Sequence, residues 1–174
     1  YAENSIRYLS SFFETHRCAG TAKPEVLIEP GTALASKAID FVAEAVSIKK
    51  VDEITYINTT GSKYNMNPSP NRINSPIQVL NFSSKSAVEV QNAKLCGYTC
   101  IESDIIHNDF NGKIAKGDLI IFQEVGSYSV VMKPPFILPD VAIIEFEEKS
   151  ETFKTVRDRQ TFDNIFRNFR FFNK

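Results

Sequence analysis

A thiol and two carboxylates stand together near the middle of the chain, in the run Cys100-Ile101-Glu102-Ser103-Asp104. A cysteine can hold or donate a proton, and a carboxylate attracts a cation such as the ammonium group of a substrate. The run follows a predicted strand, and binding and catalytic groups are common where a chain leaves a strand for a loop. The same spacing also fits a small buried cysteine beside two solvated acids. Residue chemistry alone leaves both interpretations open.

Two further positions have residue types that suit contact with a ligand. Tyr128 comes two residues after Gly126, so a tight turn would place its phenol beside a neighbouring cleft; ordinary packing between strands is the alternative. Gly31 lies at the end of a predicted strand, in the run Glu29-Pro30-Gly31-Thr32. A glycine there can adopt the positive φ that turns backbone N–H groups toward a phosphate, or it can simply end the strand.

The elements that would position these residues are a helix, one strand and then a series of strands. Apolar residues at helical spacing predict a helix over residues 1–17, and the apolar run at 25–29 predicts a short buried strand. Thr161 is the predicted N-cap of a closing helix. Between them the sequence predicts a helical turn at 33–38, followed by alternating residues at 39–49. A long polar loop is expected at 59–75 and a hairpin turn at 125–127. The predicted antiparallel strands are 53–58, 76–82, 87–97, 119–124, 127–132 and 141–146.

The composition favours one soluble globular domain. The 174 residues carry 20 Lys and Arg against 21 Asp and Glu, so no excess of positive charge is available to attract nucleic acid or an anionic membrane. No apolar stretch reaches the length of a membrane helix, and no secretory pattern opens the chain. Three cysteines suit reduced thiols, and His16 and His107 are too far apart in sequence to suggest a metal site. We therefore expect a cytoplasmic protein without a metal, a nucleic-acid partner or a membrane partner.

Several motifs of the chain, each weak by itself, occur together in the order seen in one enzyme family. They are Val26-Leu27-Ile28-Glu29-Pro30-Gly31-Thr32-Ala33-Leu34, Gly97-Tyr98-Thr99-Cys100 with Asp104, Lys116-Gly117-Asp118, Gly126-Ser127-Tyr128 and Thr155-Val156-Arg157-Asp158-Arg159-Gln160-Thr161-Phe162. In this order they resemble the C-terminal part of the fold-type III, pyridoxal-phosphate-dependent decarboxylases. That group includes the diaminopimelate, ornithine, arginine and carboxynorspermidine decarboxylases.

The resemblance implies a mainly β fold with flanking helices. Residues 1–38 would be the C-terminal remnant of a (β/α)₈ barrel that binds the cofactor, including its last helix and strand. Residues 39–174 would form an antiparallel β-barrel or sandwich domain with a closing C-terminal helix. In the family, this β-domain completes the active site across a head-to-tail homodimer. A complete enzyme of this type is much longer than this chain, because the barrel alone takes about 250 residues.

The resemblance also implies roles for individual residues. Cys100 would be the proton donor in the partner subunit's site after carbon dioxide leaves, and Glu102 and Asp104 would bind the substrate. Gly31, near the phosphate, and Tyr128 would contact pyridoxal 5'-phosphate. The cofactor's Schiff-base lysine would lie upstream of this chain, so we expect the chain alone to be inactive.

Three departures from the family pattern bear on the substrate. Thr32 stands where many members carry arginine, and Ile101 stands where the diaminopimelate and ornithine enzymes carry an acid for the distal ammonium group of the substrate. An isoleucine cannot pair with that charge, whereas Glu102, one residue on, offers a carboxylate from a shifted position. The region 129–139 also lacks the family's usual Phe-Asn-Gly.

The sequence therefore predicts the C-terminal domain of a decarboxylase that acts on a basic or polyamine-like amino acid. Two alternatives stay open. A homologue could keep the fold and act as a regulatory binding protein without catalysis, which the changes at Thr32 and Ile101 favour. An unrelated β-barrel binding module would make the order of the motifs a coincidence.

Overall fold

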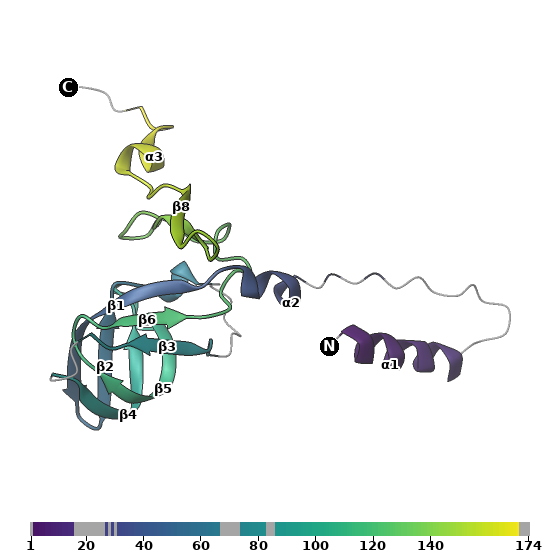
Figure 1. Cartoon of the computed structure of the whole chain (residues 1–174), viewed down its shortest axis with the longest axis horizontal. Helices are drawn as coiled ribbons and strands as arrows, with labels where there is room; N and C mark the ends of the chain where they lie inside the picture. Colours follow the sequence, from purple (N-terminus) through teal and green to yellow (C-terminus); the bar gives the residue numbers. More distant parts are fainter. Residues whose placement is uncertain are drawn as a thin grey trace. The chain divides into compact units, whose positions relative to one another are not determined.

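The computed structural model describes residues 2–15, 27, 29, 31–66, 74–82 and 86–170. The chain divides into two compact units, residues 1–30 and residues 31–174. The described part of the first unit is mainly one helix, α1 (Ala2–Thr15), which confirms the helix predicted there (Figure 1). Most of the strand predicted at 25–29 lies outside the described residues, and Leu27 and Glu29, which are described, lie in no strand.

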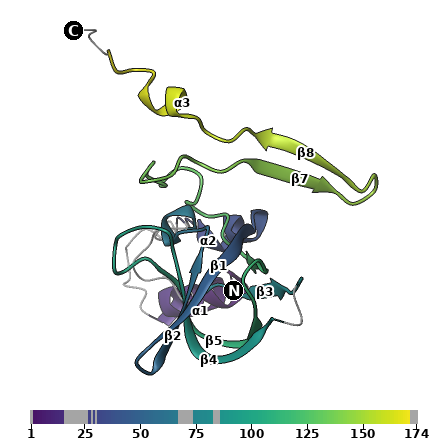
Figure 2. The same ribbon diagram turned by 90° about the vertical axis from the view of Figure 1, so that its left-hand side faces the viewer.

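The second unit is built on a six-stranded sheet that curves into a nearly closed, barrel-like form (Figures 1 and 2). The strand order is β3-β6-β1-β2-β4-β5. The strands are β1 (Phe41–Val51), β2 (Ile54–Thr59), β3 (Ile77–Leu80), β4 (Val88–Cys96), β5 (Ile105–Ile114) and β6 (Leu119–Phe122). Neighbouring strands are antiparallel except β2 and β4, which pair in parallel, for example at Ile57 and Leu95. The predicted mainly β fold is confirmed, with one parallel pair that the sequence did not indicate.

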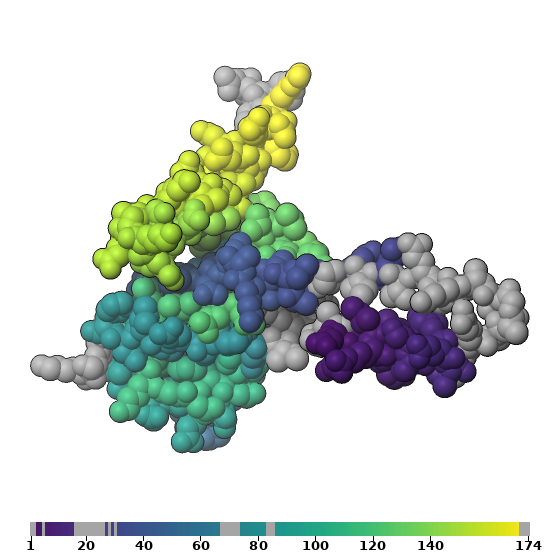
Figure 3. All heavy atoms as spheres, turned by 45° about the vertical axis from the view of Figure 1, so that its right-hand side comes forward, coloured from purple at the N-terminus to yellow at the C-terminus, as the bar shows by residue number. Residues whose placement is uncertain are grey.

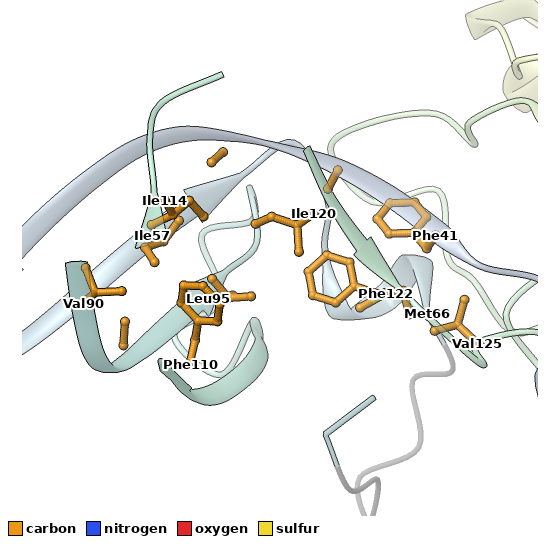
Figure 4. Close-up of a cluster of buried hydrophobic side chains, with 13 residues drawn as sticks. Phe41, Ile57, Met66, Val90, Leu95, Phe110, Ile114, Ile120, Phe122 and Val125 are labelled. Atoms are coloured by element: carbon orange, nitrogen blue, oxygen red, sulfur yellow. The ribbon is translucent and has the colours of Figure 1, made fainter. Parts of the chain in front are cut away.

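Alternating apolar side chains turn the concave face of this sheet into the core. In β1, Phe41, Ala43 and Ala45 are buried, whereas Val42 and Glu44 on the opposite face are exposed. Figure 4 shows the core side chains gathered between the strands. Its buried apolar members are Phe41, Ala43, Ala45, Ile57, Met66, Val90, Ala93, Leu95, Phe110, Ile114, Ile120, Phe122 and Val125. Each large side chain of this kind stabilises the fold by about 1.5–3 kcal/mol.

The two outer strands of the sheet, β3 and β5, are linked through asparagine side chains. The Asn74 side chain donates to the carbonyl of Asn108 over 2.9 Å and accepts from its N–H over 3.1 Å. At the other end of β3, Asn81 Nδ2 donates to the carbonyl of Lys113 over 3.2 Å. A pocket of about 490 Å³ lies at this seam, lined by residues of β3 and β5 that include His107. Burial lowers the pKa of His107.

Short helices and a separate hairpin complete the unit. Helices α2 (Thr32–Ala35) and η1 (Ser36–Ala38) confirm the helical turn predicted at 33–38, and η2 (Lys63–Asn65) lies in the predicted polar loop. A two-stranded sheet pairs β7 (Ile143–Glu147) with β8 (Thr152–Arg157), and α3 (Phe162–Phe166) follows it. This region, yellow-green to yellow in Figure 3, exposes the apolar side chains of Ile144, Phe146, Phe153, Val156 and Phe162.

The predicted N-cap of the last helix is confirmed in atomic detail. Thr161 Oγ1 accepts a hydrogen bond from the N–H of Asn164 over 3.3 Å. The Asn164 side chain in turn accepts from the N–H of Thr161 over 2.8 Å. This reciprocal capping box satisfies N–H groups that the first turn of a helix otherwise leaves without partners.

The strand predicted at 127–132 is wrong, and with it the hairpin turn at 125–127. These residues form turns, in which the N–H of Met132 donates to the carbonyl of Tyr128 over 3.0 Å. Glu124 and Tyr128 both have positive φ, which takes the backbone out of regular strand geometry at these two residues. Two strands were also missed: β5, whose pattern is broken by Asp109 at positive φ, and β8.

Candidate functional site

The loop between β4 and β5 is organised around the buried carboxylate of Asp104. Both carboxylate oxygens lie 2.9 Å from Ser62 Oγ, and Oδ1 also accepts from the N–H of Lys63 over 2.8 Å. Oδ2 accepts from the hydroxyl of Thr99 over 2.6 Å and from its N–H over 3.2 Å. The residue is only 3% exposed. A buried carboxylate is tolerated when hydrogen-bond donors surround it in this way.

Gly97, at the start of the same loop, leaves the space that the Asp104 carboxylate occupies. A Cβ atom at position 97 would lie 2.0 Å from Oδ2 of Asp104, which is closer than any real contact. The N–H of Gly97 donates to the carbonyl of Asp104 over 2.8 Å. The N–H of Asp104 donates to the carbonyl of Ile101 over 2.9 Å. Residues 97–104 therefore form a closed loop with a fixed shape.

This loop presents its other functional groups to the outside. Cys100 and Glu102 are exposed, while Ile101 is half-buried. The geometry thus separates the predicted substrate-binding pair, because Glu102 is open to a ligand whereas the carboxylate of Asp104 is taken up by donors of the chain itself. For Asp104, this arrangement favours a role in ordering the loop over direct contact with a substrate.

Two titratable neighbours of Asp104 prefer their neutral forms. Burial raises the pKa of the Cys96 thiol, the negative charge of Asp104 raises it further, and Lys94 opposes the shift. The pKa of Tyr98 is also raised, chiefly by burial and further by the charges of Asp104 and Asp140, against a hydrogen bond with Asn65 that lowers it. The thiolate, which is the reactive form of cysteine, is therefore disfavoured at Cys96.

The two residues predicted to contact a cofactor lie on segments that pack together. Gly31 is the N-cap residue just before α2, with φ of 40°, and its carbonyl accepts from the N–H groups of Leu34 and Ala35. The N–H of Gly126, two residues before Tyr128, donates to the carbonyl of Ser36 over 2.8 Å. Only a glycine fits this contact, since a Cβ at position 126 would lie 2.2 Å from the carbonyl oxygen of Ala35.

Tyr128 itself is 48% exposed. Its phenol is thus available as a hydrogen-bond donor to a phosphate or a polar ring atom. The predicted site residues fall into two groups: Gly31 and Tyr128 on adjoining segments, and Cys100, Glu102 and Asp104 on the β4–β5 loop. Within the described residues, no group of three or more His, Cys, Asp or Glu side chains is placed to hold a metal ion. No helix of the described part is long and apolar enough to cross a membrane.

Sequence reasoning missed the contribution of the polar loop at 59–75. Ser62 and the N–H of Lys63 supply half of the cradle for Asp104, and Lys63 Nζ also reaches Ser103 Oγ over 3.1 Å. Gly61 joins the same structure, because its carbonyl accepts from the N–H of Tyr98 over 3.0 Å. The only signal in the sequence was the length and polarity of the loop; loops of this length are often functional or mobile, and nothing in the sequence indicated Asp104 as a partner.

Solved structures with the same fold include two diaminopimelate decarboxylases that were each determined with L-lysine. The enzyme from Helicobacter pylori has a TM-score of 0.70 at 17% identity, over 93% of this chain and 39% of that chain. The enzyme from M. jannaschii has a TM-score of 0.70 at 16% identity, over 97% of this chain and 37% of that chain. At these identities the likeness establishes the fold.

A curated relative and a family model extend the comparison to the sequence. The diaminopimelate decarboxylase of Corynebacterium efficiens is 29% identical over 156 residues, covering 84% of this chain. The chain spans 33% of the length of that relative. The family model described as the C-terminal sheet domain of pyridoxal-dependent decarboxylases matches residues 32–126, which include all six strands of the barrel-like sheet, the Asp104 loop and Gly126. With more than half of its length matched, the chain belongs to the pyridoxal-dependent decarboxylase family.

Proposed function

We propose that this chain supplies the C-terminal sheet domain of a pyridoxal-phosphate-dependent decarboxylase that acts on a basic or polyamine-like amino acid. The observation that carries the proposal is the match of residues 32–126 to the family's sheet domain, with Cys100 exposed on a rigid loop inside the matched region. In this proposal, residues 1–38 belong to the cofactor-binding barrel and residues 39–174 to the sheet domain. The lysine that bonds the cofactor comes from outside these 174 residues.

The residues present suit the edge of such a site. Bound pyridoxal phosphate supplies the electron sink that allows the bond to the carboxylate carbon to break. The phenol of Tyr128 and the backbone at Gly31 would hold the cofactor, since both are exposed and on adjoining segments. Cys100 would hold a proton at Sγ and give it to the product after carbon dioxide has left.

Substrate choice would rest on the residues beside Cys100. Ile101 presents no charge, whereas the exposed carboxylate of Glu102 can pair with a distal ammonium group. Asp104 would act as a positioning residue, because its carboxylate fixes the loop through Ser62, Lys63 and Thr99. We propose that the loop serves the partner subunit's site in a cytoplasmic homodimer.

The test uses the protein that carries this chain together with the cofactor-binding barrel. We expect a visible absorption band of bound pyridoxal phosphate that shifts when one member of a panel of basic amino acids and carboxy-polyamines is added, with release of carbon dioxide. Cys100→Ala should retain the cofactor band and slow turnover by roughly 10²-fold or more, as expected when a positioned proton donor is lost. Cys96→Ala is the matched control, because Cys96 is half-buried in the preceding strand. Normal turnover by Cys100→Ala would exclude Cys100 as the proton donor.

The second candidate is a regulatory binding protein that has kept the fold without the chemistry. Thr32 and Ile101 favour it, because each replaces a charged residue of the family pattern with a neutral one. A protein that shows no cofactor band and releases no carbon dioxide from any compound of the panel would support this candidate over the decarboxylase.

A further inference from the structure

Outside the β4–β5 loop, two cationic side chains pair with one carboxylate. Asp140 forms an ion pair with Lys133, and its other oxygen lies 3.3 Å from Nη1 of Arg157. The side chain of Lys133 is only 4% exposed and that of Asp140 is 18% exposed. By contrast, the lysine of the surface pair Lys37–Glu124 is 81% exposed. Lys133, Asp140 and Arg157 are here called the ion clamp.

Hydrogen bonds of the backbone and of two side chains join the centre of the ion clamp to the residues around the end of β8. The N–H of Gln160 donates to the carbonyl of Asp140 over 3.0 Å, and the N–H of Asp140 donates to the Gln160 side chain over 3.2 Å. Arg157 Nη2 donates to the carbonyl of Val141 over 3.0 Å. Asp140 is therefore a fixed point, and Lys133 is the part of the clamp that reaches back along the chain toward Tyr128.

Tyr128 stands in a backbone conformation that needs support from its surroundings. Its φ of 63° lies in the left-handed region, which is unfavourable for a bulky aromatic residue. Such a conformation persists only where the neighbouring structure holds it on both sides. On the N-terminal side, the N–H of Gly126 is bonded to the carbonyl of Ser36. On the C-terminal side, the N–H of Met132 donates to the carbonyl of Tyr128, and the next residue is Lys133.

We propose that Lys133 is a positioning residue for Tyr128: its buried ion pair with Asp140 keeps the turn of residues 128–132 closed and holds Tyr128 in its strained conformation. A buried ammonium group is tolerated only while it stays paired, so Lys133 remains in place only where Asp140 faces it. Loss of the pair frees the C-terminal side of the turn, and the strain at Tyr128 then favours opening. The consequence for catalysis rests on the proposed contact of Tyr128 with the cofactor.

The charges of the ion clamp determine which variant tests it cleanly. Two cations share one carboxylate, so removing Asp140 leaves Lys133 and Arg157 both without a counter-charge. Lys133→Met instead leaves Asp140 paired with Arg157 and fills most of the same space. Lys133→Arg keeps the charge, and Lys149→Met removes an exposed lysine from the turn between β7 and β8 as a control.

The first measurement is hydrogen exchange at the amide of Met132 in the 174-residue chain, which requires neither cofactor nor activity. We expect Lys133→Met to speed exchange by about tenfold or more, because opening of the turn exposes this amide. Lys149→Met should leave the rate within about twofold of the original, and Lys133→Arg should restore most of the protection. An unchanged rate in Lys133→Met would overturn the proposal.

The second measurement asks whether the ion clamp acts on Tyr128 itself. A glycine adopts a φ of 63° without strain, so Lys133→Met should speed exchange much less in a Tyr128→Gly background. Equal effects in both backgrounds would mean that Lys133 only stabilises its own segment, which contradicts a positioning role. Amides of β4 and β5 report on global unfolding. If these also exchange faster, the comparison is repeated with Lys133→Met combined with Asp140→Leu and Arg157→Leu, an apolar set in which no charge of the ion clamp is left without a partner.

Discussion

Gly97 and Asp104 share one volume: the carboxylate of Asp104 sits where a side chain at position 97 would begin, 2.0 Å from the ideal Cβ position. The backbone N–H of Gly97 and the carbonyl of Asp104 are also joined, over 2.8 Å. The loop that exposes Cys100 is thus closed twice at its base. The shape of this loop depends on the lack of a side chain at Gly97 and on the charged side chain of Asp104.

Replacing Gly97 with alanine should therefore destabilise the chain. The added methyl group displaces a carboxylate that is held by five hydrogen-bond contacts, and overpacking of this kind costs about 1–3 kcal/mol. Urea unfolding measures the loss. In an Asp104→Ala background the same substitution should cost less, because the clashing group is gone; additive costs would show that the two residues do not interact.

Asp104→Asn should destabilise the chain even though the side chain keeps its size. In asparagine, one of the two side-chain oxygens is replaced by an NH₂ group, which can only donate. In either orientation this NH₂ group faces donors of the chain, either those of Ser62 and Lys63 or those of Thr99. Leaving buried donors without an acceptor costs about 1–3 kcal/mol for each group. Unfolding by urea gives the value, with the exposed Glu102→Gln as a control that should change little. A nearly unaltered midpoint in Asp104→Asn would contradict the structural role given to the carboxylate.

His107 should make stability depend on pH in mildly acidic solution. Burial lowers the pKa of His107 in the folded chain, whereas an unfolded histidine titrates near its ordinary value of about 6.5. The unfolded state therefore binds more protons below that pH, and stability falls as pH decreases from about 7 toward the lower pKa of the folded state. The neutral variant His107→Gln should lose less stability over this range. Parallel losses in the two proteins would rule out the imidazole as the cause.

Cys100 should react with alkylating reagents faster than Cys96. Cys100 is exposed, whereas Cys96 is half-buried and its thiol has a pKa raised by burial and by Asp104. Since the thiolate is the nucleophile, we expect a rate difference of roughly tenfold or more near neutral pH. Timed alkylation followed by peptide mass spectrometry assigns the rate to each cysteine. Faster modification of Cys96 would contradict the burial given for this strand.

Strands with regular apolar alternation were predictable from the sequence, and those with interrupted alternation were not. Phe41, Ala43 and Ala45 of β1 follow the period of a strand and are all buried. In β5 the period is broken by Asp109 and Gly112, both at positive φ, so no short window of sequence indicates a strand. The local sequence pattern predicts which face of a strand is buried. It does not predict where a bulge inserts an extra residue and shifts the alternation of buried and exposed side chains.

The candidate site shows the same division between local and distant information. The sequence placed Cys100 and Glu102 on a loop after a strand, which the structure confirms. The main partner of Asp104, Ser62, lies 42 positions away, and nothing local to either residue indicates their contact. The turn at Tyr128 was mistaken for a strand because its shape is set by Gly126 packing on Ala35, a contact between distant segments.

The parallel pairing of β2 with β4 has a consequence for how the chain folds. Parallel neighbours cannot be joined by a tight turn, and here the connection between them contains β3, which pairs with β6 on the other side of the sheet. The barrel-like sheet therefore cannot assemble one hairpin at a time, since β3 has no partner until β6 has been synthesised. Contacts between distant parts of a chain slow folding toward the millisecond-to-second range. During synthesis on the ribosome, β1 and β3 would each keep one edge open until β6 is available, and an open strand edge can pair with another chain and start aggregation.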